Sequence, residues 1–399
     1  MNSPKATVAR MAVFTLLALA LTSCRPHDFP QYPPNYREYA YVTNGGSGTV
    51  SVFDVVNVRL DRELAVGQNP VAVAVSPTRN EVYVVNSGTA GGQGSISVIN
   101  AENNTVAGAI AVHRQPVSID IDAKGDLAYV ANSGSNSISV VDLKTRREIA
   151  AIGAGEVPVA ARISSDGNTL VVANRKAGSV SLIDPAARLV RQVFEGCPGA
   201  SDAAILADSS KVFVACSGGH QIMVISLARA ASGPDKTPGL KSEAQPAQPD
   251  RLEALLDVGQ APLQLALKPD GGELFAVNSL SNSISEVINN TDDVSSATMI
   301  GEFPVSGLVS PDNSMLYVAN LRSQYVTVYA IDDGKRMGSI HVGDGPSALA
   351  LSSSGLLLFA VDSRSNDVAV VRTGTLSLFT LLSAGRAPNA IAMKAFKLP

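Results

Sequence analysis

Two of the three cysteines, Cys197 and Cys216, could form a disulfide. Counted in the repeat described below, Cys197 stands where other repeats carry Gly, and Cys216 stands where they carry Asn. These positions belong to neighbouring antiparallel strands, so we expect the two thiols to lie close together, and export would place them in an oxidising compartment. Two buried free thiols are the alternative. A metal site is less favoured because only His220 lies nearby in the sequence.

Three charged residues fall on predicted innermost strands, where most repeats carry small or apolar side chains. Asp120 and Arg162 occupy the fourth position after a Pro in adjacent repeats, and Asp202 lies two positions earlier in the next repeat. Carboxylate and guanidinium groups at this place could line a polar axial channel or bind a ligand. We favour a structural pair that links neighbouring units and neutralises buried charge.

A third set of polar residues is predicted on the loops at one edge of the fold. It consists of His113, Arg114, Arg175, Lys176, Arg322, Arg364 and Arg386. Together these side chains could form a mildly basic mouth for an anionic ligand or polymer, although nearby carboxylates dilute the charge. Solvated loop residues are the alternative. The four histidines show no metal-ligand spacing, and the chain shows no Ser-His-Asp ordering. The sequence therefore predicts no metal, no cofactor and no particular reaction.

The elements that must position these residues are set by one repeated motif. It reads Tyr-Val-Thr-Asn at Tyr41–Asn44 and Tyr-Val-Ala-Asn at Tyr129–Asn132, and weaker copies bring the number to eight. Most copies follow a Pro by sixteen residues, as Asn86 follows Pro70, and the usual period is 42 residues. Such a period indicates that the repeat, rather than the whole chain, is the unit of folding.

Each period contains four short runs rich in Val and Ile, bounded by Gly, Asn, Asp, Ser and Pro. This pattern predicts four strands per repeat, which is typical of one β-propeller blade. We expect the Asn that ends each motif, and the Gly three residues before each Pro, to shape tight turns. The overall prediction is an all-β propeller of four-stranded antiparallel blades.

The two ends of the repeat array complement each other. The first motif, at Tyr41, has no Pro-led strand before it, and the last Pro-led strand, Pro388–Met393, has no motif after it. We therefore expect the C-terminal strand to become the inner strand of the first blade, which removes a free sheet edge. This closure predicts eight blades, with seven as the alternative.

The motif, the Pro and the period resemble the YVTN-repeat β-propellers of bacterial and archaeal cell envelopes, over about residues 40–396. Well-known members have seven blades, so a count of eight departs from their pattern. The resemblance implies a surface-exposed or periplasmic binding scaffold, and related propellers include lactonases. Absence of Trp argues against WD-repeat and quinone-dehydrogenase propellers.

The N-terminus carries export and anchoring signals. Residues 1–23 have a basic start and a short apolar run, and Leu21-Thr22-Ser23-Cys24 resembles a bacterial lipobox. This predicts lipidation of Cys24 and a membrane anchor, with an ordinary secretory signal as the alternative. By resemblance to enterobacterial sorting signals, Arg25 rather than Asp after the cysteine favours the outer membrane over the inner one. Residues 24–38 are predicted to be a tether, and residues 39–399 a single propeller.

Composition limits the function further. The net charge of −4 provides no electrostatic footprint for nucleic acid. A Pro-rich insertion at about residues 229–251 is predicted between the third and fourth strands of one blade. The leading hypothesis is a monomeric, lipid-anchored scaffold that binds an envelope protein or glycan. The alternative is a lactonase-like hydrolase that uses the axial cavity and a divalent cation.

Overall fold

The computed structural model describes residues 32–229, 247–295 and 297–398. Residues 35–399 form one compact unit. The predicted signal peptide, Cys24, residues 25–31 of the predicted tether and residues 230–246 of the predicted insertion lie outside the described residues. Within the described ranges, no helix is long and apolar enough to cross a membrane.

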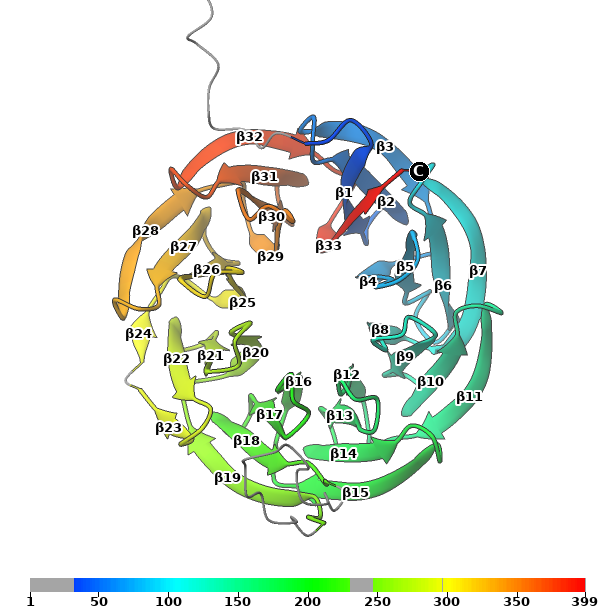
Figure 1. Cartoon of the computed structure of the whole chain (residues 1–399), viewed down its shortest axis with the longest axis vertical. Coiled ribbons are helices and arrows are strands. Elements are labelled where there is room, and N and C mark those ends of the chain that lie inside the picture. The colour runs from blue at the N-terminus through cyan, green and yellow to red at the C-terminus, as the bar shows by residue number, and fades with distance from the viewer. Residues whose placement is uncertain (1–31, 230–246, 296, 399) are drawn as a thin grey trace, which may run out of the picture. The chain divides into compact units, whose positions relative to one another are not determined.

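The strands form a ring of blades around a central axis (Figure 1). The first four blades, with strands given from the axis outward, have the following bounds. Blade 1 contains β33 (Pro388–Lys397), β1 (Tyr36–Asn44), β2 (Thr49–Asp54) and β3 (Arg59–Ala65). Blade 2 contains β4 (Pro70–Val75), β5 (Glu81–Asn86), β6 (Gln93–Asn100) and β7 (Thr105–Arg114). Blade 3 contains β8 (Pro116–Ile121), β9 (Leu127–Asn132), β10 (Ser137–Asp142) and β11 (Arg147–Gly153). Blade 4 contains β12 (Pro158–Ile163), β13 (Leu170–Asn174), β14 (Ser179–Asp184) and β15 (Leu189–Glu195).

The remaining blades follow the same order. Blade 5 contains β16 (Ala200–Ile205), β17 (Lys211–Cys216), β18 (Gln221–Ser226) and β19 (Arg251–Asp257). Blade 6 contains β20 (Pro262–Leu267), β21 (Glu273–Asn278), β22 (Ser283–Ile288) and an outer strand in two pieces, β23 (Asp293–Val294) and β24 (Thr298–Met299). Blade 7 contains β25 (Pro304–Val309), β26 (Met315–Asn320), β27 (Tyr325–Ala330) and β28 (Lys335–His341). Blade 8 contains β29 (Pro346–Leu351), β30 (Leu357–Asp362), β31 (Asp367–Arg372) and β32 (Ser377–Ser383).

The prediction of eight blades is confirmed, and the seven-blade alternative is wrong. The predicted closure is also confirmed, because β33 pairs antiparallel with β1 in a register that places Ala40 opposite Met393 and Val42 opposite Ile391. The C-terminal strand therefore supplies the axial strand of the blade that the N-terminal strand begins. A core cluster containing Val42, Phe53 and Phe359 then joins blade 8 to blade 1.

The position of a strand in its blade explains its residue pattern. The second and third strands, such as β9 and β10, are buried along nearly their whole length, since a neighbouring blade packs on each face. They accordingly read as continuous apolar runs. An outer strand such as β11 alternates between exposed and covered residues because only one of its faces is packed.

The Asn and Gly of the repeat work together, and not as the sequence predicted. The motif Asn is buried, and its amide nitrogen donates to hydroxyls on the third strand, as Asn174 Nδ2 does to Ser181 Oγ at 2.9 Å. The Gly is needed for space, because a Cβ on Gly155 would fall 2.7 Å from Asn174 Cγ. Left-handed backbone occurs instead at the residue before the Pro, for example at Val157 with φ of 55°.

We call the edge where the inner strands begin the proline rim. Its defining pairs place the first residue of each inner strand opposite the last residue of the second strand, as in Pro70 with Asn86. The connections from each outer strand to the next inner strand therefore meet the loops between second and third strands at this rim. Ser226 and Arg251, which flank the predicted insertion, lie toward the opposite rim, since β18 ends and β19 begins there.

Candidate functional site

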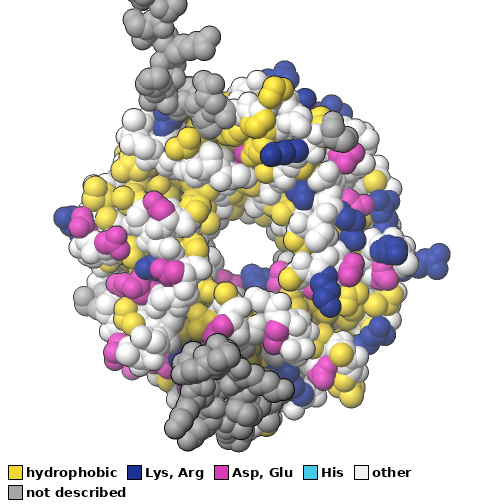
Figure 2. All heavy atoms as spheres, in the orientation of Figure 1, with side chains coloured by type: hydrophobic (Ala, Val, Ile, Leu, Met, Phe, Trp, Pro, Cys, Tyr) yellow, Lys and Arg dark blue, Asp and Glu magenta, His cyan; other side chains and the backbone are white. Residues whose placement is uncertain are grey.

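The three axial charges lie on the inner strands of blades 3, 4 and 5, around the central opening visible in Figure 2. Arg162 was expected to pair with Asp120, but it pairs with Asp202. Arg162 Nη2 binds Asp202 Oδ1 at 2.9 Å, while Asp120 Oδ2 accepts the backbone N–H of Ile163 at 2.9 Å. The remaining carboxylate oxygen of Asp202 accepts the N–H of Leu265 at 3.2 Å.

These contacts join one inner strand to the next. Gln264 extends the series, because its Oε1 accepts the N–H of Gly307 at 2.6 Å. Sequence reasoning missed Gln264 because it is uncharged, although it shares the register of Asp202, two residues into its strand. Burial raises the pKa of Asp120, and the nearby Arg162 guanidinium and two backbone N–H groups oppose that rise. The polar atoms are largely used between blades, which favours a structural role over ligand binding.

The seven rim candidates all lie on the proline rim, but they are spread around the ring from blade 2 to the junction of blades 8 and 1. Several lie beside a carboxylate. His113 Nε2 lies 3.3 Å from Glu148 Oε1, and Lys176 Nζ lies 3.1 Å from Glu156 Oε2. Arg114, Arg175 and Arg386 are exposed at separate blades. The set therefore does not form one basic mouth.

Arg322, one member of this set, lines a cavity. The cavity has a volume of about 590 Å³ and opens at the proline rim of blade 7. Its walls include Glu302, Arg322, Tyr325, Arg336 and Asp344. We call it the blade 7 cavity. Glu302 lies on the connection from blade 6, Arg336 lies on β28, and Asp344 lies on the connection to blade 8.

The third strand of blade 7 gives this cavity its aromatic wall. β27 starts with Tyr325, where blades 3, 4 and 6 start with Ser. Tyr325 is 44% exposed, and its ring meets the imidazole of His341 edge-on, with ring centres 5.2 Å apart. Gln324, another lining residue, contacts His341 Nε2 through its Oε1 at 3.2 Å. The aromatic side chain is thus held at the cavity by neighbours and still faces solvent.

The two arginines of the cavity, Arg322 and Arg336, contact uncharged groups. The Arg322 guanidinium lies over the Phe303 ring, 4.3 Å from its centre. Arg336 Nη2 donates to Ser339 Oγ at 2.6 Å. Within the described part of the chain, neither arginine forms a salt bridge, although many other basic side chains there do. Asp344 lies 3.7 Å from Arg364, which is half-exposed. Two guanidinium groups are therefore available to an anion or a polarised carbonyl.

Sequence reasoning identified Arg322 but missed Glu302, Tyr325 and Arg336 as site residues. The available signal was the substitution of Tyr for Ser at the start of a third strand. Glu302 and Arg336 occupy positions whose residue type varies from blade to blade, so a comparison of the repeats does not identify them as site residues. Among the described residues, no group of three or more His, Cys, Asp or Glu could hold a metal ion.

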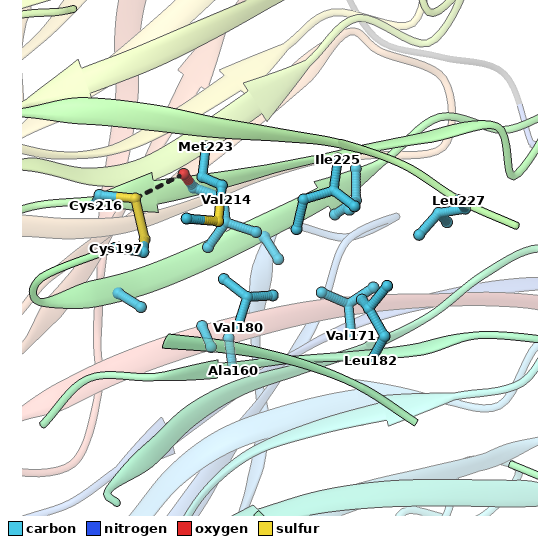
Figure 3. Packing of buried hydrophobic residues seen from close by; sticks show 14 residues of the cluster. Ala160, Val171, Val180, Leu182, Cys197, Val214, Cys216, Met223, Ile225 and Leu227 are labelled. Carbon is cyan, nitrogen blue, oxygen red and sulfur yellow. Dashed lines mark hydrogen bonds between the residues drawn. A yellow bond between two sulfur atoms is a disulfide. The ribbon is translucent and has the colours of Figure 1, made fainter. Parts of the chain in front are cut away.

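Cys197 and Cys216 meet at the proline rim of blade 5, inside the core shared with blade 4 (Figure 3). Their sulfur atoms are 2.02 Å apart and their Cα atoms 4.7 Å apart. The paired change has a steric reason. A residue with a Cβ at the Gly position collides with Asn, as the geometry of Gly155 and Asn174 shows. Replacing both residues by Cys removes the collision and fills the same space.

A family model described as "Lactonase, 7-bladed beta-propeller" matches residues 39–153, which include most of β1, all of β2 and β3, and all of blades 2 and 3. The solved structure of the dihydro-heme d1 dehydrogenase NirN has a TM-score of 0.67 at 13% identity, covering 94% of this chain and 78% of that one. The chain has a β-propeller fold, and residues 39–153 of it resemble the lactonase family model. No curated protein matches it at a significant level.

Two further structures support this fold. A candidate 6-phosphogluconolactonase from Bacteroides uniformis has a TM-score of 0.59 at 14% identity, covering 90% of this chain and all of that one. Kuenenia stuttgartiensis hydrazine synthase has a TM-score of 0.56 at 20% identity, covering 76% of this chain and 95% of that one. At such identities the likeness concerns the fold alone.

Proposed function

We propose that this protein binds and hydrolyses a small hydroxylated lactone in the blade 7 cavity. The observation that carries the proposal is the pair of guanidinium groups, Arg322 and Arg336, that line the same cavity as the carboxylates of Glu302 and Asp344. The lactonase family match over residues 39–153 supports the choice of substrate class. The candidate 6-phosphogluconolactonase from Bacteroides uniformis shares the propeller fold on which such a site would be built.

The cavity holds the groups that lactone hydrolysis requires. Water attacks the lactone carbonyl, and a carboxylate of Glu302 or Asp344 accepts the proton that the water loses. A guanidinium stabilises the negative charge that develops on the carbonyl oxygen. The ring C–O bond then breaks, and the leaving oxygen takes back the proton to give a hydroxy acid. The exposed face of Tyr325 can cover the apolar face of a sugar-like ring.

Replacing Arg322 by Ala is expected to lower kcat/KM for lactones by about 100-fold, the usual effect of removing one donor to a developing oxyanion. Rates are measured by pH-stat on a panel of sugar-acid lactones. Lys176→Ala is the matched control, because Lys176 is an exposed basic residue of the same rim on blade 4. Equal rates for wild type and Arg322→Ala would contradict the proposed site. Saturable binding without turnover would favour a binding scaffold for an envelope glycan or protein.

We further propose that the chain is an exported lipoprotein of the YVTN-repeat type, anchored through Cys24 and held at the outer membrane. The lipobox-like sequence Leu21–Cys24 supports this proposal. The placement of Cys197 and Cys216 as a buried pair also supports it, because disulfides persist mainly in oxidising compartments.

Cys24→Ala is expected to move the protein from the membrane fraction to the soluble fraction without changing its melting temperature. Acyl chains supply the binding by hydrophobic insertion, and the substituted residue lies before the first blade. Fractionation after a salt wash, followed by thermal unfolding of the soluble protein, measures both effects. A Cys24→Ala protein that stays with the washed membrane would refute the lipid anchor.

A further inference from the structure

Blade 8 departs from the other blades at the place where the motif Asn normally lies. In blade 6, Asn278 Nδ2 donates to Ser283 Oγ at 3.3 Å and to Ser285 Oγ at 3.0 Å. In blade 8 the Asn is replaced by Asp362, and the two hydroxyl positions are taken by Asp367 and Ala369. An amide with two hydroxyl partners has thus become a pair of carboxyl groups.

The Asp362 carboxyl group and the Oδ1 atom of Asp367 are buried next to each other. Asp362 is fully buried, and it lies directly opposite Asp367 on the neighbouring strand. Asp362 Oδ2 accepts the backbone N–H of Gly343 at 3.0 Å. A Cβ on Gly343 would fall 2.7 Å from that oxygen and still closer to Asp367 Oδ1. Both side chains therefore converge beneath the turn that begins at Gly343.

One proton would complete this arrangement. The Oδ1 atoms of Asp362 and Asp367 are buried and, within the described residues, lack a partner when both groups are treated as acceptors. Two ionised carboxylates can only accept hydrogen bonds, so they cannot satisfy each other. A proton on one of them supplies the donor that the Asn amide supplies in other blades. Burial and the neighbouring Asp367 also raise the pKa of Asp362 to about 8.

The surroundings offer no competing cation. Asp344 and Arg364, on the turns at the rim, lie 3.7 Å apart with about half of each side chain exposed. In the described structure, neither Asp362 nor Asp367 forms a salt bridge with a basic residue. The other elements around the pair contribute uncharged groups at closest approach. They are Pro346 on β29, Ala369 on β31 and Ser383 on β32.

We propose that Asp362 and Asp367 share one proton and form a clamp that holds the Gly343 turn on blade 8 and stabilises the fold less as the pH rises through the neutral range. When the shared proton leaves, two adjacent buried carboxylates repel each other, and the hydrogen bond between the pair is lost. The turn continues into Asp344, a wall residue of the blade 7 cavity. The clamp is a property of the fold and does not depend on the proposed hydrolysis.

The sign of the pH dependence follows from the bound proton. The folded protein keeps this proton up to about pH 8, whereas Asp362 in the unfolded chain has the ordinary aspartate pKa of 3.8. Stability from the clamp is therefore complete below about pH 4 and is lost as the pH rises toward 8, since the folded state binds more protons in this window. The unfolding constant changes by up to about tenfold per pH unit there.

The test compares urea unfolding of the wild type and Asp362→Asn between pH 5 and pH 9. Asn restores an amide that can donate to Asp367, so Asp362→Asn should gain at least about tenfold in folding equilibrium constant over the wild type between pH 6 and pH 8.5. Asp367→Ser, which restores the common hydroxyl, should flatten the same pH dependence. Asp332→Asn, an exposed carboxylate of blade 7, is the control and should leave the wild-type slope unchanged.

Parallel pH profiles for wild type, Asp362→Asn and Asp367→Ser would overturn the proposal. If Asp362→Asn does not fold, Asp367→Ser alone decides the outcome. Carboxyl-carbon NMR of the wild type adds a site-specific readout. The clamp predicts that Asp362 titrates well above the ordinary range of aspartate, and titration of both carboxyls near pH 4 would contradict it.

Discussion

Deletion of Ala387–Pro399 is expected to unfold the propeller or leave it aggregated. The deletion removes β33, which pairs with β1 from Tyr36 to Asn44 and closes the ring. Ile391 and Met393 pack on the core cluster between blades 8 and 1. A fully buried apolar side chain contributes about 1.5–3 kcal/mol, and these two side chains are partly buried, so each contributes less. Their loss together with the hydrogen bonds of the whole strand pairing should cost about 5 kcal/mol or more. That approaches the whole stability of many domains.

The measurement is the melting temperature and soluble yield of the truncated protein. The control removes only residues 398 and 399, just beyond the strand. Leu398 exchanges backbone and side-chain hydrogen bonds with Asn35, so this control should lose about 1 kcal/mol. If the ring opens as expected, the unpaired edge of β1 should promote association of the truncated protein. A truncated protein that lacks Ala387–Pro399 and still melts like the wild type would contradict a stabilising role for ring closure.

Loss of the Cys197–Cys216 bond has the second-largest expected effect. The bond joins residues 19 apart, and a loop of this size predicts about 3 kcal/mol in the chain-entropy model. Both cysteines are completely buried in the core between blades 4 and 5. Unfolding of Cys197→Ala/Cys216→Ala by urea should show this loss. Thiol labelling of the unfolded, unreduced protein in a Cys24→Ala background should detect no thiols before reduction and two after it.

Variants that follow the repeat separate the bond from its packing. Cys197→Gly/Cys216→Asn recreates the usual pair and should retain the fold without the bond. Cys216→Asn alone should be less stable than this double variant, because the new amide would collide with the Cβ of Cys197. The equivalent positions in blade 4 show the collision, since a Cβ on Gly155 would lie 2.7 Å from Asn174 Cγ. Overpacking of this kind costs about 1–3 kcal/mol. Two reactive thiols before reduction would contradict the disulfide, and equal stability of the two Asn variants would contradict the steric argument.

The fold was predictable because the spacing from Pro to Asn in each repeat indicates which residues of the first two strands pair. Pro70 and Asn86 lie sixteen residues apart in the sequence and face each other across the blade. The same spacing in the other copies fixes the phase of the ring and its closure. The role of Asn174 was predicted less well. An Asn at the end of a strand is typical of a turn, so the sequence predicted that its side chain shapes the turn. Its actual partners, Ser179 and Ser181, lie on the next strand.

The candidate site was only partly predictable, for a geometric reason. Residues that share a position in the repeat lie at the same level along the propeller axis, but each lies on a different blade and therefore at a different place around the ring. Arg175 and Arg386 therefore share a rim without sharing a surface. Residues on adjacent inner strands do meet, as Arg162 and Asp202 show. The blade 7 cavity combines residues of unequal register, such as Glu302 and Arg336, so only the folded chain reveals it.

The central claim is that the blade 7 cavity holds the ligand, and calorimetric titration with a sugar acid tests it most directly. Gluconate, the hydroxy acid formed from a simple sugar lactone, carries the carboxylate that Arg322 and Arg336 should bind. We predict saturable binding at one site, weakened at least tenfold in Arg322→Ala/Arg336→Ala and unchanged in Lys176→Ala. Binding of equal strength in all three proteins, or no saturable binding to the wild type by gluconate or its lactone, would contradict the account.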